Sequence, residues 1–354
     1  MGLFSRSSKH ELTQLNSSNS LNKSTSSLSS KNSTNNLKFS RNDIRINQVG
    51  DGVSGRVDLF RSRSSPEFKY AVKTYHSKEM YETKSEYKDR VLYEYNTLRH
   101  LDHENIIQVY KYDVSFNGLT VKTFMEAGSP NLYQLIKSTP KDKLDPLGMQ
   151  CVWKQVCQGV KYLHDHDICH RDLKLENLIV DISTRTVKII DLVTAADVHQ
   201  NKQAIGLVGS PTYFAPETLE KIRYDGKKAD IWSLGIILYY LLNKKFPWKS
   251  AKISDERYFA FIQPNPEYDQ QSADILPNPI YDEKTHLEIG KPSVLRYLPS
   301  HSLSLTSQIF ESDPDKRCGI DNFYADEWFN SILFCHKGIK CGVNHTIIFK
   351  DHET

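Results

Sequence analysis

The chain has 354 residues, and its 46 lysine and arginine residues nearly balance 43 aspartate and glutamate residues, for a formal net charge of +3. This length exceeds what one undivided core usually holds, and the near-neutral charge excludes a strongly basic nucleic-acid binder and a strongly acidic solvating chain. Six cysteines are too few for a disulfide framework, and the longest apolar run is too short for a membrane span, so we expect a soluble, cytoplasmic protein without a nucleic-acid partner.

The first 40 residues differ in composition from the rest. Serine, threonine and asparagine make up 22 of them, and five basic residues against one acidic residue give a net charge of +4. Such a segment buries too little apolar surface to offset its ordering entropy, so residues 1–41 are predicted to form a disordered tail. A phosphorylated regulatory arm and a solvated extension without a role both remain open. Arg6 stands where a myristoylation signal requires serine or threonine, which disfavours a lipid anchor.

Residues 44–75 alternate apolar and polar side chains in short runs, which predicts three strands. A segment of the pattern G-x-G-x-x-G-x-V joins the first two strands, and its glycines would let backbone N–H groups approach phosphate oxygens. Dinucleotide-binding sites share this spacing, but there a helix follows, so the second strand favours a hairpin that covers a nucleotide. A plain hairpin without a ligand is the alternative. The segment consists of Gly50, Asp51, Gly52, Val53, Ser54, Gly55, Arg56 and Val57.

A helix is predicted over residues 81–101, because apolar residues recur on one face between Tyr87 and Leu98. Glu94 falls on the same stripe, and a carboxylate that faces a core needs a partner. Lys73, at the end of the third strand, is the natural candidate. A solvated Glu94 at the edge of the stripe is the alternative.

Two further strands are expected at residues 106–112 and 119–125, followed by helices at 131–136 and 148–166. The chain is therefore strand-rich up to about residue 126 and mainly helical afterwards. This order predicts an α+β protein of two lobes, a small β-rich N-lobe and a larger helical C-lobe, with a cleft between them.

The next segment reads His170-Arg171-Asp172-Leu173-Lys174-Leu175-Glu176-Asn177. This H-R-D-L-K-x-x-N pattern resembles the catalytic loop of the eukaryotic protein kinases. Other motifs of that family follow the same order along the chain. They are the glycine-rich segment, Ala71-Val72-Lys73, Glu94, Asp191, Ala215-Pro216-Glu217, Asp230-Ile231-Trp232-Ser233-Leu234-Gly235 and Arg317.

The resemblance implies a bilobal protein-kinase fold over residues 42–334, divided into an N-lobe (42–126) and a C-lobe (127–334), with an extension at 335–354. Residues 263–300 are rich in proline, aspartate and asparagine, which predicts a long loop inserted in the C-lobe. An insertion without a role is favoured there over a docking site.

The resemblance also implies roles in phosphoryl transfer from Mg-ATP, which depends on alignment and charge neutralisation. Asp172 would orient the substrate hydroxyl and accept its proton, and Lys174 would offset the charge of the transferred group. Lys73, held by Glu94, would contact the α- and β-phosphates. The oxygen ligands of Mg²⁺ would be Asn177 and Asp191.

ATP would lie under the glycine-rich segment, with its adenine in an apolar pocket next to a hinge. The resemblance assigns the pocket to Val49, Val57, Ala71, the gatekeeper Met125 and Ile179, and the hinge to Glu126 and Ala127. Two structural roles are also implied, a buried ion pair between Glu217 and Arg317 and an anchor for the catalytic loop at Asp230.

Lys174, two residues after Asp172, is typical of the serine/threonine class, which implies transfer to hydroxyls of protein substrates. A small-molecule kinase is disfavoured by the long activation segment. Glu176 matches a position that meets a basic substrate residue in related kinases; a solvated carboxylate is the alternative. A shorter similarity to fungal kinases that regulate nutrient and potassium transporters suggests a link to membrane transporters. It is carried by Phe246-Pro247-Trp248-Lys249 and Ser254-Asp255.

The metal-binding motif departs from the family pattern, because Asp191-Leu192-Val193 replaces D-F-G. Leu192 can supply the apolar plug, but the β-branched Val193 restricts the backbone where glycine is usual. A pseudokinase scaffold that binds nucleotide or partners therefore remains the alternative to an active enzyme.

The activation segment is the second departure. Residues 195–209 contain no serine, threonine or tyrosine, and the usual phosphorylated position falls on Gly206. Arg171 would therefore lack a phosphate partner, and activity would not require phosphorylation at that position. Ser210 is expected to contact Asp172.

Cysteines and histidines near the end of the sequence invite a zinc site made of Cys335, His336, Cys341 and His345. Their spacing differs from that of a standard zinc finger or ribbon. Buried or idle thiols and surface histidines are therefore the expectation.

Overall fold

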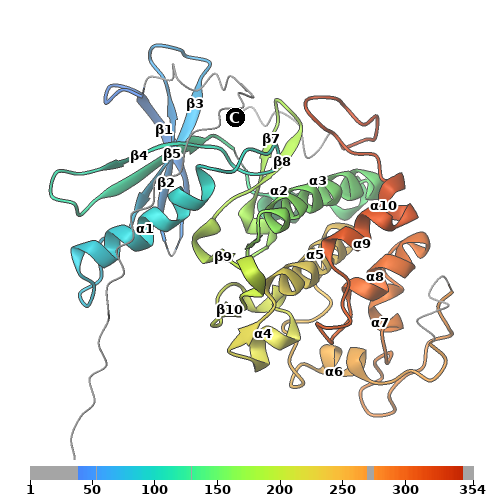
Figure 1. The fold of residues 1–354 in the computed structure, drawn as a ribbon. Helices are drawn as coiled ribbons and strands as arrows, with labels where there is room; N and C mark the ends of the chain where they lie inside the picture. Colours follow the sequence, from blue (N-terminus) through green and yellow to red (C-terminus); the bar gives the residue numbers. More distant parts are fainter. Residues whose placement is uncertain (1–38, 53, 129, 269–274, 346–354) are drawn as a thin grey trace, which may run out of the picture. The chain divides into compact units, whose positions relative to one another are not determined.

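The computed structural model describes residues 39–52, 54–128, 130–268 and 275–345 (Figure 1). Within the first part of this described range, five antiparallel strands form one sheet in the order β1-β2-β3-β5-β4. The strands are β1 (Ile44–Asp51), β2 (Gly55–Arg61), β3 (Lys69–Tyr75), β4 (Val109–Val114) and β5 (Val121–Glu126).

The helix α1 (Lys84–Leu98) follows β3 and packs against β4 and β5. It begins later than predicted because Thr83 caps it. The Thr83 side chain accepts a hydrogen bond from the Glu86 N–H, and the Glu86 side chain accepts one from the Thr83 N–H. The inner face of α1 follows the predicted stripe, and its buried residues are Tyr87, Val91, Glu94 and Leu98.

Phe39 lies in the predicted tail, yet its ring packs against the sheet. The ring centroid of Phe39 is 4.9 Å from that of Tyr70 on β3 and 5.2 Å from that of Phe124 on β5. Ordered packing therefore begins before the boundary predicted at residue 42. The rest of the predicted tail, residues 1–38, lies outside the described residues.

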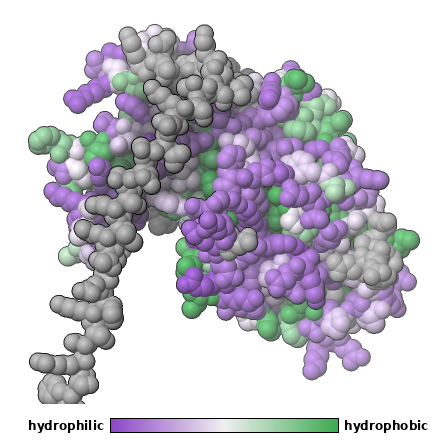
Figure 2. Space-filling view, in the orientation of Figure 1, coloured by the Kyte–Doolittle hydropathy of each residue, from purple (hydrophilic) through white to green (hydrophobic). Residues whose placement is uncertain are grey.

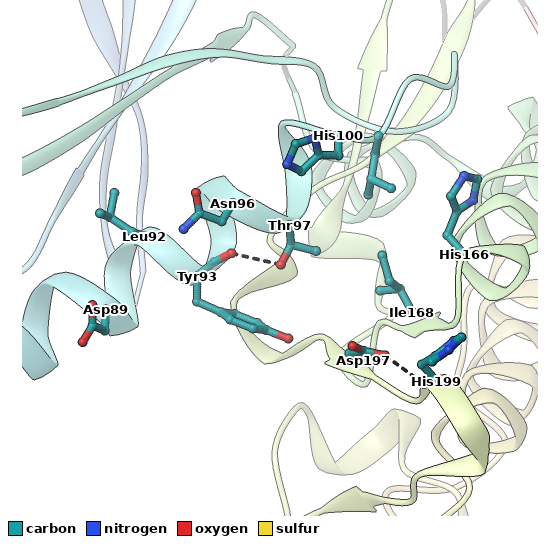
Figure 3. Close-up of a pocket in the computed structure, with 11 residues that line it drawn as sticks. Asp89, Leu92, Tyr93, Asn96, Thr97, His100, His166, Ile168, Asp197 and His199 are labelled. Carbon is teal, nitrogen blue, oxygen red and sulfur yellow. Dashed lines mark hydrogen bonds between the residues drawn. The ribbon is translucent and has the colours of Figure 1, made fainter. Parts of the chain in front are cut away.

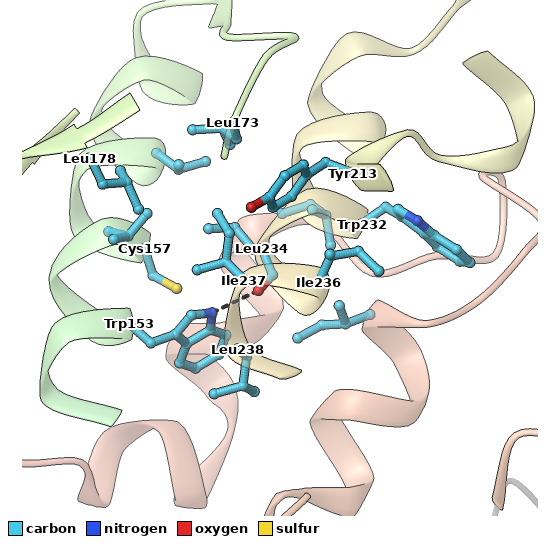
Figure 4. Packing of buried hydrophobic residues seen from close by; sticks show 14 of the residues in the cluster. Trp153, Cys157, Leu173, Leu178, Tyr213, Trp232, Leu234, Ile236, Ile237 and Leu238 are labelled. Carbon is cyan, nitrogen blue, oxygen red and sulfur yellow. Dashed lines mark hydrogen bonds between the residues drawn. The ribbon is translucent and has the colours of Figure 1, made fainter. Parts of the chain in front are cut away.

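Helices dominate the second part of the chain, where α3 (Pro146–Asp165) and α5 (Gly226–Asn243) pack against each other (Figure 4). Trp153 on α3 is fully buried, and its Nε1 donates a 2.9 Å hydrogen bond to the carbonyl of Leu234 on α5. Burial of one large apolar side chain contributes roughly 1.5–3 kcal/mol to the stability of the fold. The packing of α3 against α5 therefore gives the loops of the candidate site a rigid support. The expected α+β organisation, with a sheet-rich lobe before a helical one, is confirmed.

Shorter elements complete this lobe. The helices are α2 (Leu132–Ser138), α4 (Pro216–Glu220), α6 (Glu256–Ile262), α7 (Pro292–Leu295), α8 (Leu303–Ile309), α9 (Ile320–Ala325) and α10 (Glu327–Ser331). The short strands are β6 (Ile168–Cys169), β7 (Leu178–Asp181), β8 (Thr186–Ile189), β9 (Ala196–Asp197), β10 (Ala204–Ile205) and β11 (Arg223–Tyr224). The 3₁₀ turns are η2 (Lys141–Lys143), η3 (Leu175–Asn177), η4 (Leu192–Thr194), η5 (His199–Asn201), η6 (Pro211–Tyr213) and η8 (Ser300–Ser302).

The predicted long loop at residues 263–300 is more structured than expected. It contains the helix α7 and an antiparallel bridge between Tyr281 and Glu288. Arg296 holds Glu288 with N–O distances of 2.6 and 3.0 Å, and the Nζ of Lys291 lies 2.7 Å from Glu311. Side-chain contacts thus anchor a segment whose described residues are otherwise mostly irregular; residues 269–274 lie outside the described residues.

The face drawn in Figure 2 is mostly hydrophilic, and its hydrophobic patches are small and separate. In the described part of the chain, no helix combines the length and the apolar character that crossing a bilayer requires.

Candidate active site

The glycine-rich hairpin joins β1 to β2, with Gly50 opposite Val57 and Asp51 opposite Arg56. The N–H of Gly52 donates a 3.1 Å hydrogen bond to the carbonyl of Gly55. A Cβ on Gly55 would lie 2.5 Å from the Thr74 carbonyl oxygen on β3, so only glycine permits this approach. Val53 lies outside the described residues. Ser54 is anchored through its carbonyl, which accepts a 3.2 Å bond from the His76 N–H.

Lys73 lies at the centre of a charge cluster, in which Lys73 and Glu94 are buried and Asp191 is partly exposed. Its Nζ is 2.8 and 3.1 Å from the two carboxylate oxygens of Glu94, and 3.1 Å from Oδ1 of Asp191. The pairing expected from the helical stripe is thus present. Tyr75, which the sequence did not indicate, donates a further hydrogen bond of 2.6 Å to Glu94.

The charges in this cluster shift each other's titration. Burial alone would lower the pKa of Lys73, but the negative charges of Glu94 and Asp191 outweigh it and raise that pKa above its ordinary value. Burial would raise the pKa of Asp191, yet the ammonium of Lys73 holds it below the ordinary value. Both groups therefore stay ionised near neutral pH.

Asp172 is surrounded by donors from three directions. Its Oδ2 accepts hydrogen bonds from Lys174 Nζ at 2.7 Å and from Asn177 Nδ2 at 3.2 Å. Its Oδ1 accepts one from Ser210 Oγ at 3.1 Å, so the expected contact with Ser210 is confirmed. The side chain is thus fixed in one orientation.

Asp230, at the start of α5, holds the backbone of the same loop. One carboxylate oxygen accepts from the His170 N–H at 2.8 Å, and the other accepts from the Arg171 N–H at 2.9 Å. The His164 ring lies 2.9 Å from the first oxygen. Asp230 is 1% exposed, so it acts on the loop and has no access to a substrate. This matches the anchoring role expected of it.

The backbone of the Asp191-Leu192-Val193 segment bears on the substituted glycine. Asp191 has a left-handed conformation, with φ of 64°, whereas Val193 lies inside the 3₁₀ turn η4 and has negative φ. Leu192 is fully buried in the main core cluster, which also contains Leu98 of α1. The turn therefore places no demand at residue 193 that only glycine could meet.

Asn177 and Asp191 present oxygen atoms suited to a hard cation. The amide nitrogen of Asn177 donates to the carbonyl and the carboxylate of Asp172, which leaves its side-chain carbonyl oxygen as the ligand atom. Asp191 is ionised and engages Lys73 through Oδ1, so its second oxygen can serve a metal. An amide carbonyl and a carboxylate are ligands that Mg²⁺ accepts.

The residues assigned to the adenine pocket come from both lobes. In the sheet, Ala71 on β3 pairs with Met125 on β5, and Val57 pairs with Lys73. Ile179 on β7 is 8% exposed. Val49 on β1 and Ala127 are half-buried, and Glu126 forms a 3.1 Å ion pair with Lys188.

Gly128 was missed by sequence reasoning. It follows Ala127 directly, and a Cβ there would overlap the side chain of Ile179. Because residue 128 has no Cβ, the segment after Ala127 can pack closely on β7. A lone glycine after an apolar strand gave no signal that distinguished it from an ordinary loop residue.

Arg171 binds the activation segment through its backbone. Its Nη2 donates to the carbonyl oxygens of Ile205 at 2.5 Å and Gly206 at 2.8 Å, and its Nε donates to the Tyr224 hydroxyl at 3.0 Å. Gly206 has φ of +83°, a conformation that favours glycine. Backbone carbonyl oxygens of the activation segment thus accept hydrogen bonds from the guanidinium of Arg171.

The expected structural pair is present between Glu217 and Arg317. Their N–O distances are 2.6 and 2.9 Å, and both side chains are at most 2% exposed. Glu176 differs, since its buried Oε2 has no hydrogen-bond partner among the described residues. It lies close enough to Tyr213 for its charge to raise the pKa of that phenol, in addition to the larger effect of burial.

A separate hollow lies between α1 and the strands β6 and β9 (Figure 3). Tyr93, Asn96 and His100 line it from α1, and Ile168 and Asp197 line it from the strands. Among the described residues that line it, none belongs to the Lys73 or Asp172 cluster. The hollow is therefore distinct from the catalytic geometry.

Comparison with known protein families supports the assignment that the sequence motifs suggested. The pattern that describes the protein kinase domain matches residues 44–329. The chain belongs to the protein kinase family. The motifs and the bilobal fold that suggested this family from the sequence are thereby confirmed.

Three curated kinases illustrate the relationship. The chain is 33% identical to the serine/threonine-protein kinase oca2 of Schizosaccharomyces pombe, covering 81% of this chain and 48% of that protein. It is 29% identical to the nitrogen permease reactivator protein of Saccharomyces cerevisiae, over 85% and 40% of the two chains. It is 31% identical to the serine/threonine-protein kinase SRK2F of Arabidopsis thaliana, over 80% and 73%. The chain thus matches less than half the length of these two fungal relatives.

Proposed function

We propose that this chain is a serine/threonine protein kinase that transfers the γ-phosphate of ATP to hydroxyl groups of protein substrates. The observation that carries the proposal is the assembled charge cluster, with Lys73 bound to both Glu94 and Asp191. An inactive arrangement would separate these groups, because the lysine–glutamate ion pair and the metal-binding aspartate must both be in place for transfer.

In the proposed reaction, Asp172 orients the substrate hydroxyl and accepts its proton as the oxygen attacks the γ-phosphorus. The bond from the γ-phosphorus to the bridging oxygen breaks, and ADP leaves with that electron pair. Lys174, 2.7 Å from Asp172, offsets the charge on the transferred group. Mg²⁺, held by Asn177 and Asp191, would neutralise charge on the phosphates.

ATP in this proposal is bound by both lobes. The backbone of the hairpin from Gly50 to Gly55 would cover the phosphates, and Lys73 would bind the α- and β-phosphates. Adenine would contact the apolar residues on β2, β3, β5 and β7, next to the hinge at Glu126 and Ala127. Glu94 and Tyr75 keep Lys73 in place, so they would affect binding through it.

Glu176 supports a preference for basic substrates. A buried carboxylate oxygen without a partner among the described residues carries a desolvation cost that a substrate arginine or lysine would remove.

A link between this kinase and other cellular processes can be proposed only from its relatives. The similarity to the nitrogen permease reactivator protein motivates the proposal that membrane transporters depend on this kinase. A cytoplasmic location belongs to the same proposal.

The test is phosphoryl transfer by the purified full chain, with Mg-ATP and peptides that carry serine, threonine or tyrosine after basic residues. We expect labelling of serine or threonine, and a loss of about 10²-fold or more in Asp172→Asn. Nucleotide binding, seen as a thermal shift, without turnover that depends on Asp172 would instead identify a pseudokinase scaffold.

A further inference from the structure

Three cysteines and one histidine meet away from the catalytic site. One is Cys151 on α3, and the other three, Cys335, Cys341 and His345, lie beyond α10. One possible ligand atom of each lies within 4.8 Å of the others. Cys151, Cys335 and His345 are buried, and Cys341 is partly exposed.

The distances in this cluster fit a tetrahedral metal better than isolated thiols. The Sγ of Cys341 lies 3.7 Å from that of Cys335 and 3.8 Å from that of Cys151. Zinc–sulfur bonds of about 2.3 Å place the sulfurs of a regular tetrahedron about 3.8 Å apart. The Nε2 of His345 is 3.0 and 3.2 Å from two of the sulfurs, slightly inside the corresponding edge.

The backbone conformation after α10 brings the cysteine and histidine cluster close to α3. Lys337 and Gly338 have φ of 46° and 77°, and His336 pairs with Ile339, so a tight turn places Cys335 near Cys341. Gly148, in the first turn of α3, lets the later segment approach. A Cβ on it would lie 2.8 Å from the Asn344 carbonyl oxygen and 2.9 Å from Cβ of His345.

Neighbouring groups supply donors to the sulfur of Cys151. The backbone N–H of Cys335 lies 3.3 Å from it, and Nε2 of Gln155 lies 3.6 Å from it. A thiol is a weak acceptor, whereas metal-bound thiolates are commonly stabilised by such surrounding hydrogen bonds. His336 is directed elsewhere, because its ring contacts Glu104.

We propose that Cys151, Cys335, Cys341 and His345 bind one zinc ion in a closed Cys₃His site. With four protein ligands, such a site leaves no open coordination position and is structural. The ion would connect the segment after α10 to the start of α3. This differs from the sequence-based set in that Cys151 replaces His336. The inference does not depend on kinase activity.

The test is the metal content of the full chain, purified under reducing conditions without chelators and measured by mass spectrometry. We expect about one zinc per chain in the wild type and in two controls, Cys318→Ser and His336→Gln. Cys341→Ser and His345→Gln should lower the zinc content and its retention during dialysis. Cys341 is the partly exposed ligand, so its replacement is the least disruptive to folding.

A second measurement guards against variants that misfold. Cobalt introduced into the wild-type chain should give thiolate charge-transfer absorption and the intense visible bands of tetrahedral cobalt. Wild-type chain without metal, with six titratable thiols, would overturn the proposal. So would full zinc retention in both ligand variants, loss of zinc in His336→Gln, or a stoichiometric metal other than zinc.

Discussion

The guanidinium of Arg171 lies 2.8 Å from the carbonyl oxygen of Gly206, at the position where related kinases carry a phosphate. This contact predicts that activity does not depend on phosphorylation of the activation segment. Phosphatase-treated enzyme should keep its rate, and mass spectrometry of active enzyme should find no stoichiometric phosphate there. A phosphate on Thr194, Ser210 or Thr212 on which activity depends would contradict this.

The positive φ of Gly206 allows a sharper test. Gly206→Ala should weaken the segment, since a left-handed conformation costs a residue with a Cβ about 1–2 kcal/mol, and should lower the transfer rate. Gly118→Ala is the matched control, because Gly118 also has positive φ and an open surrounding, but lies between β4 and β5. Equal transfer rates in the two variants would show that the conformation of Gly206 does not affect activity.

Val193 predicts a small effect of restoring the family's glycine. Because Val193 already lies in a 3₁₀ turn with negative φ, Val193→Gly should change the transfer rate by no more than a few-fold. Asp191→Asn, as a control, should abolish activity that depends on Mg²⁺. An increase of about tenfold or more in Val193→Gly, equivalent to about 1.4 kcal/mol, would show that valine restrains the enzyme.

Glu176 predicts substrate selectivity. Glu176→Gln should reduce kcat/KM for a peptide with an arginine before the acceptor by about 10-fold or more, because a charge-assisted hydrogen bond contributes about 1.5–3 kcal/mol. The rate on a peptide without basic residues should change little. Glu267→Gln, at an exposed carboxylate, is the control. Equal losses on both peptides would argue against a role in selectivity.

Replacement of Arg317 is predicted to lower the stability of the fold by a large amount. Arg317→Met leaves the Glu217 carboxylate buried and unpaired, which should lower the free energy of unfolding by about 3–5 kcal/mol. Lys316→Met, next to it but with a side chain 76% exposed, should cost less than about 1 kcal/mol. Urea denaturation measures both. Similar costs for the two variants would contradict the importance of the buried pair.

The Lys291–Glu311 pair predicts a pH dependence. Burial would raise the pKa of Glu311, but Lys291 outweighs it and lowers the pKa below its ordinary value. The pair therefore stabilises the fold above the unfolded pKa of glutamate, and this contribution is lost as pH falls through the lower, folded pKa. The stability difference between wild type and Lys291→Met should shrink between neutral pH and about pH 3. A difference that is constant with pH would contradict it.

Local patterns account for much of what sequence reasoning predicted. Alternation located the strands, and the stripe on α1 placed Glu94 toward the core, where Lys73 is its partner. The contact of Ser210 with Asp172, 38 residues earlier, followed from the family resemblance and not from a local pattern. The domain boundaries and the roles of the site residues in catalysis remain predictions.

The remainder depends on contacts between distant segments. The backbone N–H of Cys335 contacts the sulfur of Cys151, although 184 residues separate the two in the sequence and no spacing rule relates them. Tyr75 reads as an ordinary strand residue, and only the packing of α1 reveals its bond to Glu94. The four-residue helix α7 is too short for a periodic signal, and its position depends on the ion pair of Lys291.

Lys154 has a consequence for how the catalytic unit can be excised. Its buried ammonium donates to the carbonyl oxygens of Phe329, Asn330 and Ile332 at 2.8–3.3 Å. A recombinant fragment cut after residue 329, where the family match ends, would retain the catalytic motifs but remove two of these acceptors. It would also uncover the first turns of α3. We therefore expect a stable fragment to extend past residue 329, where the family match ends.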